Sequence, residues 1–169
     1  INGAGAAGMM CAIEAGKRGR KVLLVDHSKK IGEKIRISGG GRCNFTNIHT
    51  HPNKFISNNP KFIKSALSQY TQNDFIDLIK KHKIKFHEKK LGQLFCDHSA
   101  QQIVEMLLTE CELANVVLKK EFKVTDVNKE NNQYKVITVD EVYSCQSLII
   151  ATGGLSVPKI GATPFGYEI

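Results

Sequence analysis

The 169-residue chain has no tryptophan and no apolar run that approaches the roughly 20 residues of a membrane span. No basic region stands before its opening glycines and alanines, so we predict no signal peptide. Its five cysteines form no Cys-x-x-Cys pair, and its six histidines form no cluster with metal-ligand spacing. These absences predict a cytoplasmic protein with reduced thiols, without a metal site and without a membrane partner.

Acidic residues are also few, and the formal charge of +8 comes from 24 Lys+Arg against 16 Asp+Glu. A positive surface attracts nucleic acid. However, the lysines are scattered and aromatic residues make up only 7% of the chain, so few rings are available to stack on bases. The densest lysine group, residues 80–90, predicts a solvated helix face. Nucleic acid is therefore the less favoured partner.

Glycine, in contrast, gathers in three places, and the first is the turn Gly3-Ala4-Gly5-Ala6-Ala7-Gly8. This spacing predicts the phosphate turn of a dinucleotide-binding unit. Gly3 makes the tight turn, Gly5 lets the backbone approach a pyrophosphate, and Gly8 lets the following helix pack closely on the sheet. The first free N–H groups of that helix are where the pyrophosphate is expected to bind.

A short β-branched run at residues 21–25 follows the expected helix and predicts a strand buried on both faces. The run ends in Asp26, where the motif calls for an acid about 20 residues after the glycines to bind a ribose hydroxyl. An acid at this position favours a free 2′-hydroxyl, which suits FAD or NAD better than NADP.

The second glycine cluster is the run Ser38-Gly39-Gly40-Gly41-Arg42-Cys43-Asn44. Consecutive glycines adopt positive φ readily and present N–H groups to an anion, and Arg42 adds a forked cation suited to phosphate. We favour ligand contact here over a flexible surface loop. For Cys43, two interpretations stay open: a thiol that tunes a reaction near a cofactor, or a packing residue, of which packing is favoured.

The rest of the chain predicts a helical and loop insertion at residues 48–98, with a small β element around Gly92. A helix capped by Ser99 and a third parallel strand at residues 116–118 are expected next. Alternating segments between residues 122 and 145 predict a three-stranded antiparallel meander. Residues 147–151 predict a buried strand that leads into the third glycine cluster, Ala151-Thr152-Gly153-Gly154.

The glycine turn, the acid after the second strand and the block SGGGRCNFTN together resemble the BaiN-like or YhiN-like flavoproteins, the aminoacetone-oxidase family of NAD(P)/FAD-dependent oxidoreductases. The resemblance implies an α/β, glutathione-reductase-type FAD-binding Rossmann-like domain with a parallel sheet. Residues 1–169 would be its N-terminal part, incomplete at both ends and without the second domain. In such a fold Ala151, Thr152 and Gly153 approach the cofactor, and the backbone near Val124 lies beside the adenine.

We therefore expect an FAD-dependent oxidoreductase that binds the ADP and pyrophosphate part of FAD and acts on a small molecule, with NAD(P)H as a possible electron donor. An NAD-dependent dehydrogenase is an alternative, against which the meander weighs. A non-catalytic, FAD-binding, RNA-associated module is another. No catalytic residue is assigned, although His87, His98 and Tyr167 are candidates by residue type. The sequence predicts neither the substrate nor the oligomeric state.

Overall fold

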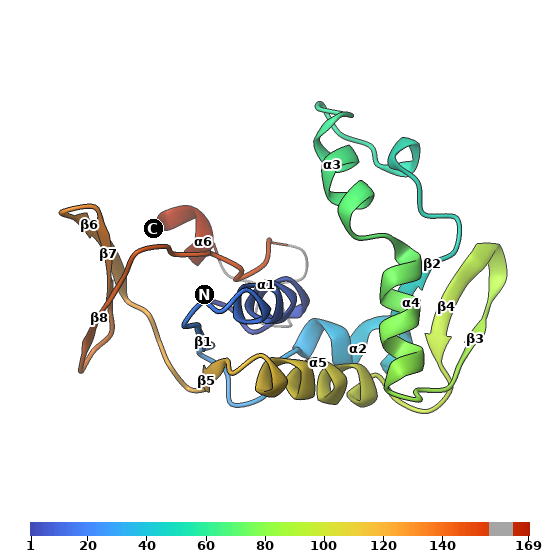
Figure 1. Ribbon diagram of the computed structural model, residues 1–169, viewed down its shortest axis with the longest axis horizontal. Helices are drawn as coiled ribbons and strands as arrows, with labels where there is room; N and C mark the ends of the chain where they lie inside the picture. Colours follow the sequence, from blue (N-terminus) through green and yellow to red (C-terminus); the bar gives the residue numbers. More distant parts are fainter. Residues whose placement is uncertain (156–163) are drawn as a thin grey trace. The chain divides into compact units, whose positions relative to one another are not determined.

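Figure 1 shows a computed structural model of the chain, which describes residues 1–155 and 164–169. The chain forms two compact units. The first unit comprises Ile1–Lys34 and Leu107–Ile169, and the second comprises Ile35–Met106. None of the helices in the described part combines the length and the apolar character that crossing a membrane requires.

The first unit is built on parallel backbone segments. Strands β1 (Leu23–Val25) and β5 (Val117–Lys119) pair in parallel. On the other side of β1, the N–H of Val25 donates to the carbonyl of Ile1 at 2.9 Å, and residue 2 forms a parallel bridge to Val25. Residue 2 also bridges Ile150 in parallel. The resulting order, β5, β1, residues 1–3 and residues 149–151, corresponds to strands 3-2-1-4 at the centre of a doubly wound sheet.

Helix α1 (Ala6–Lys17) covers this sheet because its apolar residues recur on one face. Met9, Ala12 and Ile13 are buried. At its C-terminal end, a Cβ on Gly16 would overlap the carbonyl oxygen of Ala114, the residue that follows helix α5 (Gln101–Leu113). Close approach of these two segments therefore depends on the missing side chain of Gly16.

The predicted meander is present in the first unit as β6 (Asp126–Glu130), β7 (Gln133–Ile137) and β8 (Val142–Cys145), all antiparallel. It begins later than expected, because the segment from Phe122 to Thr125 is not a strand. Instead, Val124 is buried with Val25 and Val136, and Phe122 packs against them. This cluster joins the meander to the parallel sheet.

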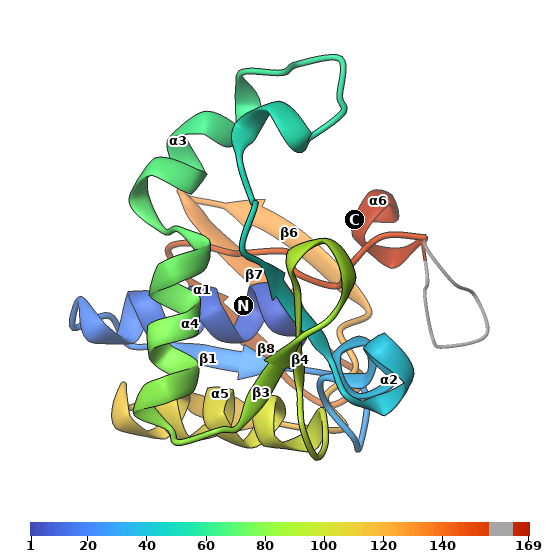
Figure 2. The same ribbon diagram turned by 90° about the vertical axis from the view of Figure 1, so that its right-hand side faces the viewer.

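The second unit contains an antiparallel sheet in the order β2 (Asn44–Asn47), β4 (Gln93–Cys96), β3 (Phe86–Glu88). Figure 2 shows helix α4 (Gln72–Lys81) beside these strands. Phe45 of β2 holds this arrangement together, since its ring centroid lies 6.0 Å from that of Phe75 and 5.5 Å from that of Phe86. Strand β2 was not predicted, because only its pairing with β4 makes it a strand.

The remaining short elements are η1 (Pro52–Lys54), α3 (Phe62–Gln69), η2 (Lys90–Gly92) and α6 (Phe165–Glu168), together with α2 (Glu33–Gly41). The predicted Ser99 cap is present, since the N–H of Gln101 donates to the Ser99 hydroxyl at 3.1 Å. Helix α4 also begins with a cap, because Thr71 forms a capping box with Asp74. Helix α6 lies in the described C-terminal residues 164–169.

The contact at Gly16 generates a prediction about stability. In an unobstructed helix, Gly16→Ala would stabilise the protein by roughly 1 kcal/mol through helix propensity. Because the new Cβ overlaps the Ala114 carbonyl, we expect destabilisation by about 1–3 kcal/mol instead. Thermal unfolding of the full-length protein measures this change. A melting temperature above that of the wild type would show that the two segments do not touch.

Candidate functional site

The glycine turn of the first unit lies where residues 1–3 and 149–151 run side by side. Gly3 has φ +108°, and a Cβ there would overlap the carbonyl oxygen of Ala151. A Cβ on Gly8 would overlap the carbonyl oxygen of Gly3. Protein packing alone therefore requires both glycines. Strands β1 and β5 follow on one side of residues 1–3, whereas residues 149–151, which come later in the chain, lie on the other side. The strand order therefore reverses here, which makes this the switch point where ligands bind in open α/β sheets.

Gly5 differs from its two neighbours in the motif. Its φ of −84° is accessible to any residue, and a Cβ there would find no described protein atom within 4 Å. Neither backbone strain nor internal packing explains a glycine at this position. A ligand that approaches the backbone closely does explain it.

The N-terminal end of α1 is open at the same place. Gly5 is the N-cap residue, no side chain of the described residues caps the helix, and its first turn carries no acid. The first hydrogen bond of the helix is donated by the N–H of Met9 to the carbonyl of Gly5 at 3.0 Å, and the side chains of Ala6 and Ala7 are exposed. The positive end of the helix dipole is thus available to an anion.

Asp26 follows β1 and holds this turn in place. Its Oδ2 accepts the N–H of Ala4 at 2.7 Å, and its Oδ1 accepts the N–H of Ser28 at 2.8 Å. The side chain is only 13% exposed. A carboxylate has about four lone-pair sites, so two backbone bonds leave capacity for a ligand hydroxyl. The structure adds a role that the sequence did not reveal, because Asp26 positions the glycine turn itself.

The third glycine cluster forms the other side of the switch point. The N–H of Ala151 donates to the carbonyl of Asn2 at 2.7 Å, Thr152 follows half-buried, and Gly153 has φ +80°. Lys34 was missed by sequence reasoning: its Nζ donates to the carbonyl of Gly154 at 3.1 Å. Nothing in the polar stretch around Lys34 marks it, since the partner is 120 residues away.

Val124 lies in the same unit, but its side chain is only 6% exposed and belongs to the core. Any contact with a ligand would involve its backbone, as the resemblance implied. Its predicted role beside an adenine stays a prediction.

The Ser38–Asn44 cluster belongs to the second unit, where it forms a tightly bonded turn. Helix α2 loses helical geometry at Ser38, and Gly39, Gly40 and Gly41 have φ of +59°, +67° and +86°. The carbonyl of Ser38 accepts the N–H of Cys43 at 2.9 Å. A Cβ on Gly39 would lie 2.6 Å from the ring of Phe95, so packing requires a glycine there.

Two further backbone bonds anchor this turn. The carbonyl of Gly41 accepts the N–H of Ala100 at 2.7 Å, and that of Arg42 accepts the N–H of Cys96 at 2.9 Å. The side chains of Arg42 and Asn44 are exposed, and none of the acids among the described residues pairs with Arg42. The turn therefore presents an exposed guanidinium from a fixed backbone.

The burial of Cys43 supports the packing interpretation of this residue. It is buried, and desolvation raises the pKa of its thiol. The pairing of β2 with β4 brings Cys96 near it, and burial, with a smaller contribution from Cys43, raises the pKa of Cys96 to about 11. The sequence did not reveal this neighbour. Both thiols stay protonated at neutral pH, which weighs against a nucleophilic role.

The candidate acids and bases His87, His98 and Tyr167 lie on separate segments of the chain. His87 of β3 lies with its Nδ1 2.7 Å from Oδ1 of Asp97, while His98 is exposed. Tyr167 of α6 is 72% exposed. Among residues 1–155 and 164–169, no three side chains gather to hold a metal ion.

Comparison with known proteins decides the family. The family described as HI0933-like protein Rossmann domain matches this chain over residues 1–169. The chain belongs to this family. The HI0933-like chain is 56% identical over 169 residues to the ribosomal RNA dihydrouridine synthase of Escherichia coli, covering 100% of this chain and 42% of that protein. It is 23% identical over 172 residues to the 3-dehydro-bile acid delta(4,6)-reductase of Clostridium scindens, covering 100% and 42%.

The HI0933-like chain thus spans about two fifths of the length of these curated relatives. Among solved structures it is similar to glycine oxidase from Bacillus cereus, with a TM-score of 0.58 and 16% identity over 92% of this chain and 56% of that one. The expected fold class, a Rossmann-type FAD-binding α/β fold with a parallel sheet and an antiparallel meander, is confirmed. Kinship with the BaiN-like and YhiN-like flavoproteins is supported.

The three glycines of the turn give a matched set of variants. Gly5→Ala is expected to leave the melting temperature unchanged, because the Cβ enters open space, and to weaken FAD binding at least about tenfold. Gly3→Ala and Gly8→Ala are expected to destabilise the protein by about 2 kcal/mol or more, through overlap and, at Gly3, backbone strain. Thermal unfolding and FAD titration of the full-length apoprotein distinguish these effects. Wild-type FAD affinity in Gly5→Ala would contradict the close approach of a ligand to Gly5.

Thiol reactivity tests the burial of the cysteines. Burial raises the pKa of Cys96 and Cys111 to about 11, so about one thiol in a thousand is ionised at pH 8. Cys43 has its pKa raised for the same reason. Because a raised pKa lowers the thiolate fraction, labelling of these three by iodoacetamide is expected to be slow and to accelerate with pH. Cys11 and Cys145 are half-buried and should label faster, as read by peptide mass spectrometry. Fast labelling of Cys43 would contradict its packing role.

Proposed function

We propose that the full-length protein is an FAD-dependent reductase of a uridine in ribosomal RNA, and that the first unit binds the ADP half of its FAD. The observation that carries the cofactor assignment is the open position at Gly5 beside the uncapped end of α1. A pyrophosphate there receives N–H groups of the turn formed by Gly3, Gly5, Ala6, Ala7 and Gly8. The residues present fit the cofactor.

Asp26 and the third glycine cluster complete this half of the site in the proposal. The free lone pairs of Asp26 would bind the adenosine ribose. Because Asp26 Oδ2 also accepts the N–H of Ala4, the same side chain fixes the ribose position relative to the glycine turn that would bind the phosphates. The pyrophosphate would be flanked on its other side by the segment beside residues 1–3, at Ala151, Thr152 and Gly153. Lys34 adds positive charge next to them through its bond to Gly154.

We also propose the Ser38–Asn44 turn of the second unit as a cofactor contact. Its support is local: consecutive positive-φ glycines direct backbone N–H groups outward, and the Arg42 guanidinium has no acidic partner among the described residues. The exposed Asn44 amide oxygen adds an acceptor, since the amide nitrogen donates to the carbonyls of Leu94 and Thr46.

Bound FAD supplies hydride transfer, and the residues of this chain bind it, orient it and neutralise its phosphates. In the proposed reaction, NADH or NADPH is oxidised, and a hydride and a proton add across the ring carbon–carbon double bond of uridine. The names of both curated relatives describe reduction of carbon–carbon double bonds. The substrate proposal rests on the relative with 56% identity. It reverses the preference against nucleic acid that composition suggested.

An NAD-dependent dehydrogenase is less well supported. A simple NAD unit alternates strand and helix, whereas β6, β7 and β8 interrupt this alternation between β5 and residues 149–151.

The test uses the purified full-length protein. We expect a yellow protein whose heat-released cofactor co-elutes with FAD, and whose absorbance bleaches with NADH or NADPH under anaerobic conditions. Incubation with ribosomal RNA from a strain that lacks the enzyme should add two hydrogens to a uridine, as detected by nucleoside mass spectrometry. A reaction without NAD(P)H is the control. A colourless protein that binds NAD but not FAD would overturn the proposal. Bleaching of the flavin absorbance without reduction of the RNA would overturn the assignment of the substrate.

A further inference from the structure

Residues 48–70 of the second unit, which we call the arm, contain no buried residue. The arm includes η1 and α3, and neither element buries a side chain. Its large apolar residues are instead strongly exposed: Ile56 completely, Phe62 at 79% and Phe55 at 43%. Exposed apolar residues gathered on one segment mark a surface that meets a partner.

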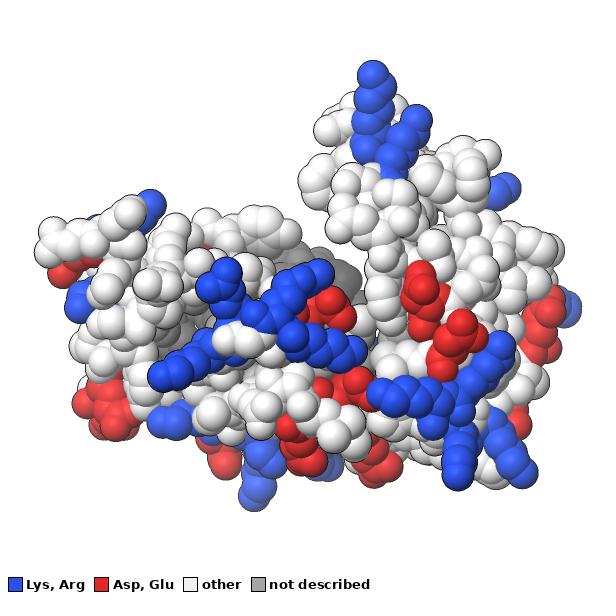
Figure 3. Space-filling view, viewed as in Figure 1, with Lys and Arg blue, Asp and Glu red and all other residues white. Residues whose placement is uncertain are grey.

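The charge of this region identifies the kind of partner. No Asp or Glu occurs anywhere in residues 34–73, although the chain has 16 acids. The arm itself carries Lys54, Lys61 and Lys64, and Figure 3 shows blue side chains and no red ones around its end on the visible face. A basic surface without interspersed acids is complementary to a polyanion.

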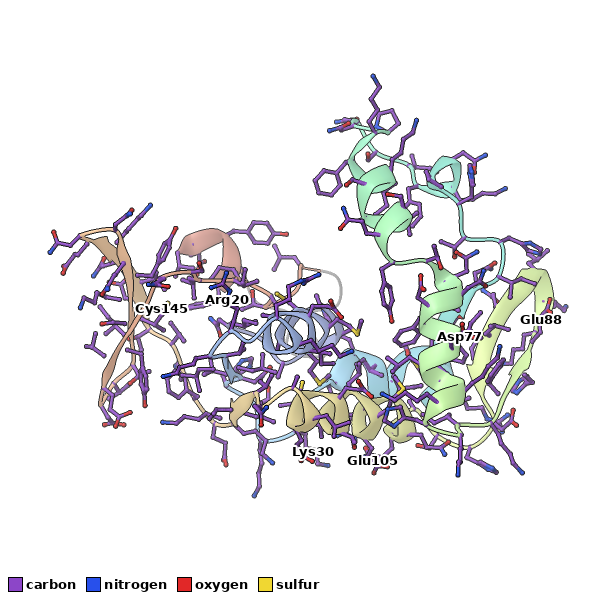
Figure 4. The ribbon with its side chains drawn as sticks, viewed as in Figure 1. Arg20, Lys30, Asp77, Glu88, Glu105 and Cys145 are labelled. Atoms are coloured by element: carbon purple, nitrogen blue, oxygen red, sulfur yellow. The ribbon has the colours of Figure 1, made fainter. Side chains whose placement is uncertain are left out.

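The acids of the second unit lie outside the arm, and the one nearest to it in sequence, Asp74, bonds to Thr71 in the cap of α4. Figure 4 shows Asp77 on α4 and Glu88 on β3, away from the arm. Among the described residues, no ion pair involves Lys54, Lys61 or Lys64. Their charges are therefore not neutralised by this part of the chain.

We propose that the arm docks single-stranded RNA, with the three lysines on phosphates and Phe55 and Phe62 stacking on bases. This deepens the proposed function, on which it rests, by assigning the surface that recruits the RNA substrate. Aromatic rings interleaved with lysines are what sequence-tolerant single-strand binding requires, since every base offers a π face. The exposed amides of Asn53, Asn58 and Asn59 add donors and acceptors between them. Composition alone disfavoured nucleic acid because aromatics are few, but the structure exposes two of them among the lysines.

The lysines are tested by fluorescence anisotropy of the full-length protein with a labelled oligouridylate over a range of salt concentrations. The triple variant Lys54→Gln, Lys61→Gln, Lys64→Gln should bind at least about tenfold more weakly at low salt. The slope of log K against log salt should fall by about two, at roughly 0.7 per lost phosphate contact. The control triple Lys21→Gln, Lys120→Gln, Lys129→Gln removes the same charge from exposed sites of the first unit. It should keep the wild-type slope.

The aromatic ring is tested by two replacements at Phe62. Phe62→Leu keeps apolar volume but removes the ring, and it should weaken binding roughly tenfold. Phe62→Tyr keeps a stacking face and should bind like the wild type. Because the side chain is largely exposed, neither change should lower the melting temperature.

Other results would overturn the proposal. If the arm packs against another part of the full-length protein, the arm variants will bind RNA like the wild type, and Phe62→Ser will lower the melting temperature. If both lysine triples weaken binding equally, the attraction is diffuse and the arm has no special role. Reduction of ribosomal RNA by the wild type is measured separately, so a wild type that forms no dihydrouridine counts against the proposed function, whereas unchanged binding by arm variants counts against the arm.

Discussion

The glycine turn depends on the carboxylate of Asp26. This one side chain accepts the N–H of Ala4 through one oxygen and the N–H of Ser28 through the other. Hydrogen bonds to a charged group contribute about 1.5–3 kcal/mol each, and the low exposure of Asp26 limits competition from water. The bonds join the end of β1 to the turn that follows the first segment. The backbone of Asp26 also accepts the N–H of Phe122 at 2.9 Å, which leads the chain toward the meander.

With the turn held in this way, the three glycines have separate physical explanations. Gly3 and Gly8 are required by the protein itself, because a Cβ on either would overlap backbone. Gly5 is not required by any described protein atom. A single motif therefore combines two packing constraints with one position that no described protein atom explains. This distinction is the strongest link between the fold and the proposed cofactor.

In the turn at Ser38–Asn44 of the second unit, neighbouring glycines also have different explanations. Gly39 is required by the ring of Phe95, whereas Gly40 faces open space with φ +67°. Backbone bonds from Cys96 and Ala100 fix the carbonyls of Arg42 and Gly41, so the turn is anchored and its guanidinium is left exposed. The buried thiols beneath it act as small apolar groups, since desolvation keeps them protonated.

The sequence by itself determined the features that depend on neighbours along the chain. The glycine spacing, Asp26 after its strand, the Ser99 cap and the meander strands follow from backbone freedom, capping and alternation within a few residues. Only the tertiary structure decided the rest: the place of residues 149–151 beside residue 2, strand β2, Cys96 near Cys43, and Lys34 on Gly154. These contacts join residues that lie roughly 50 to 150 positions apart, and no local pattern encodes them. They form because burying apolar faces brings distant segments together, and hydrogen bonding then fixes which atoms meet.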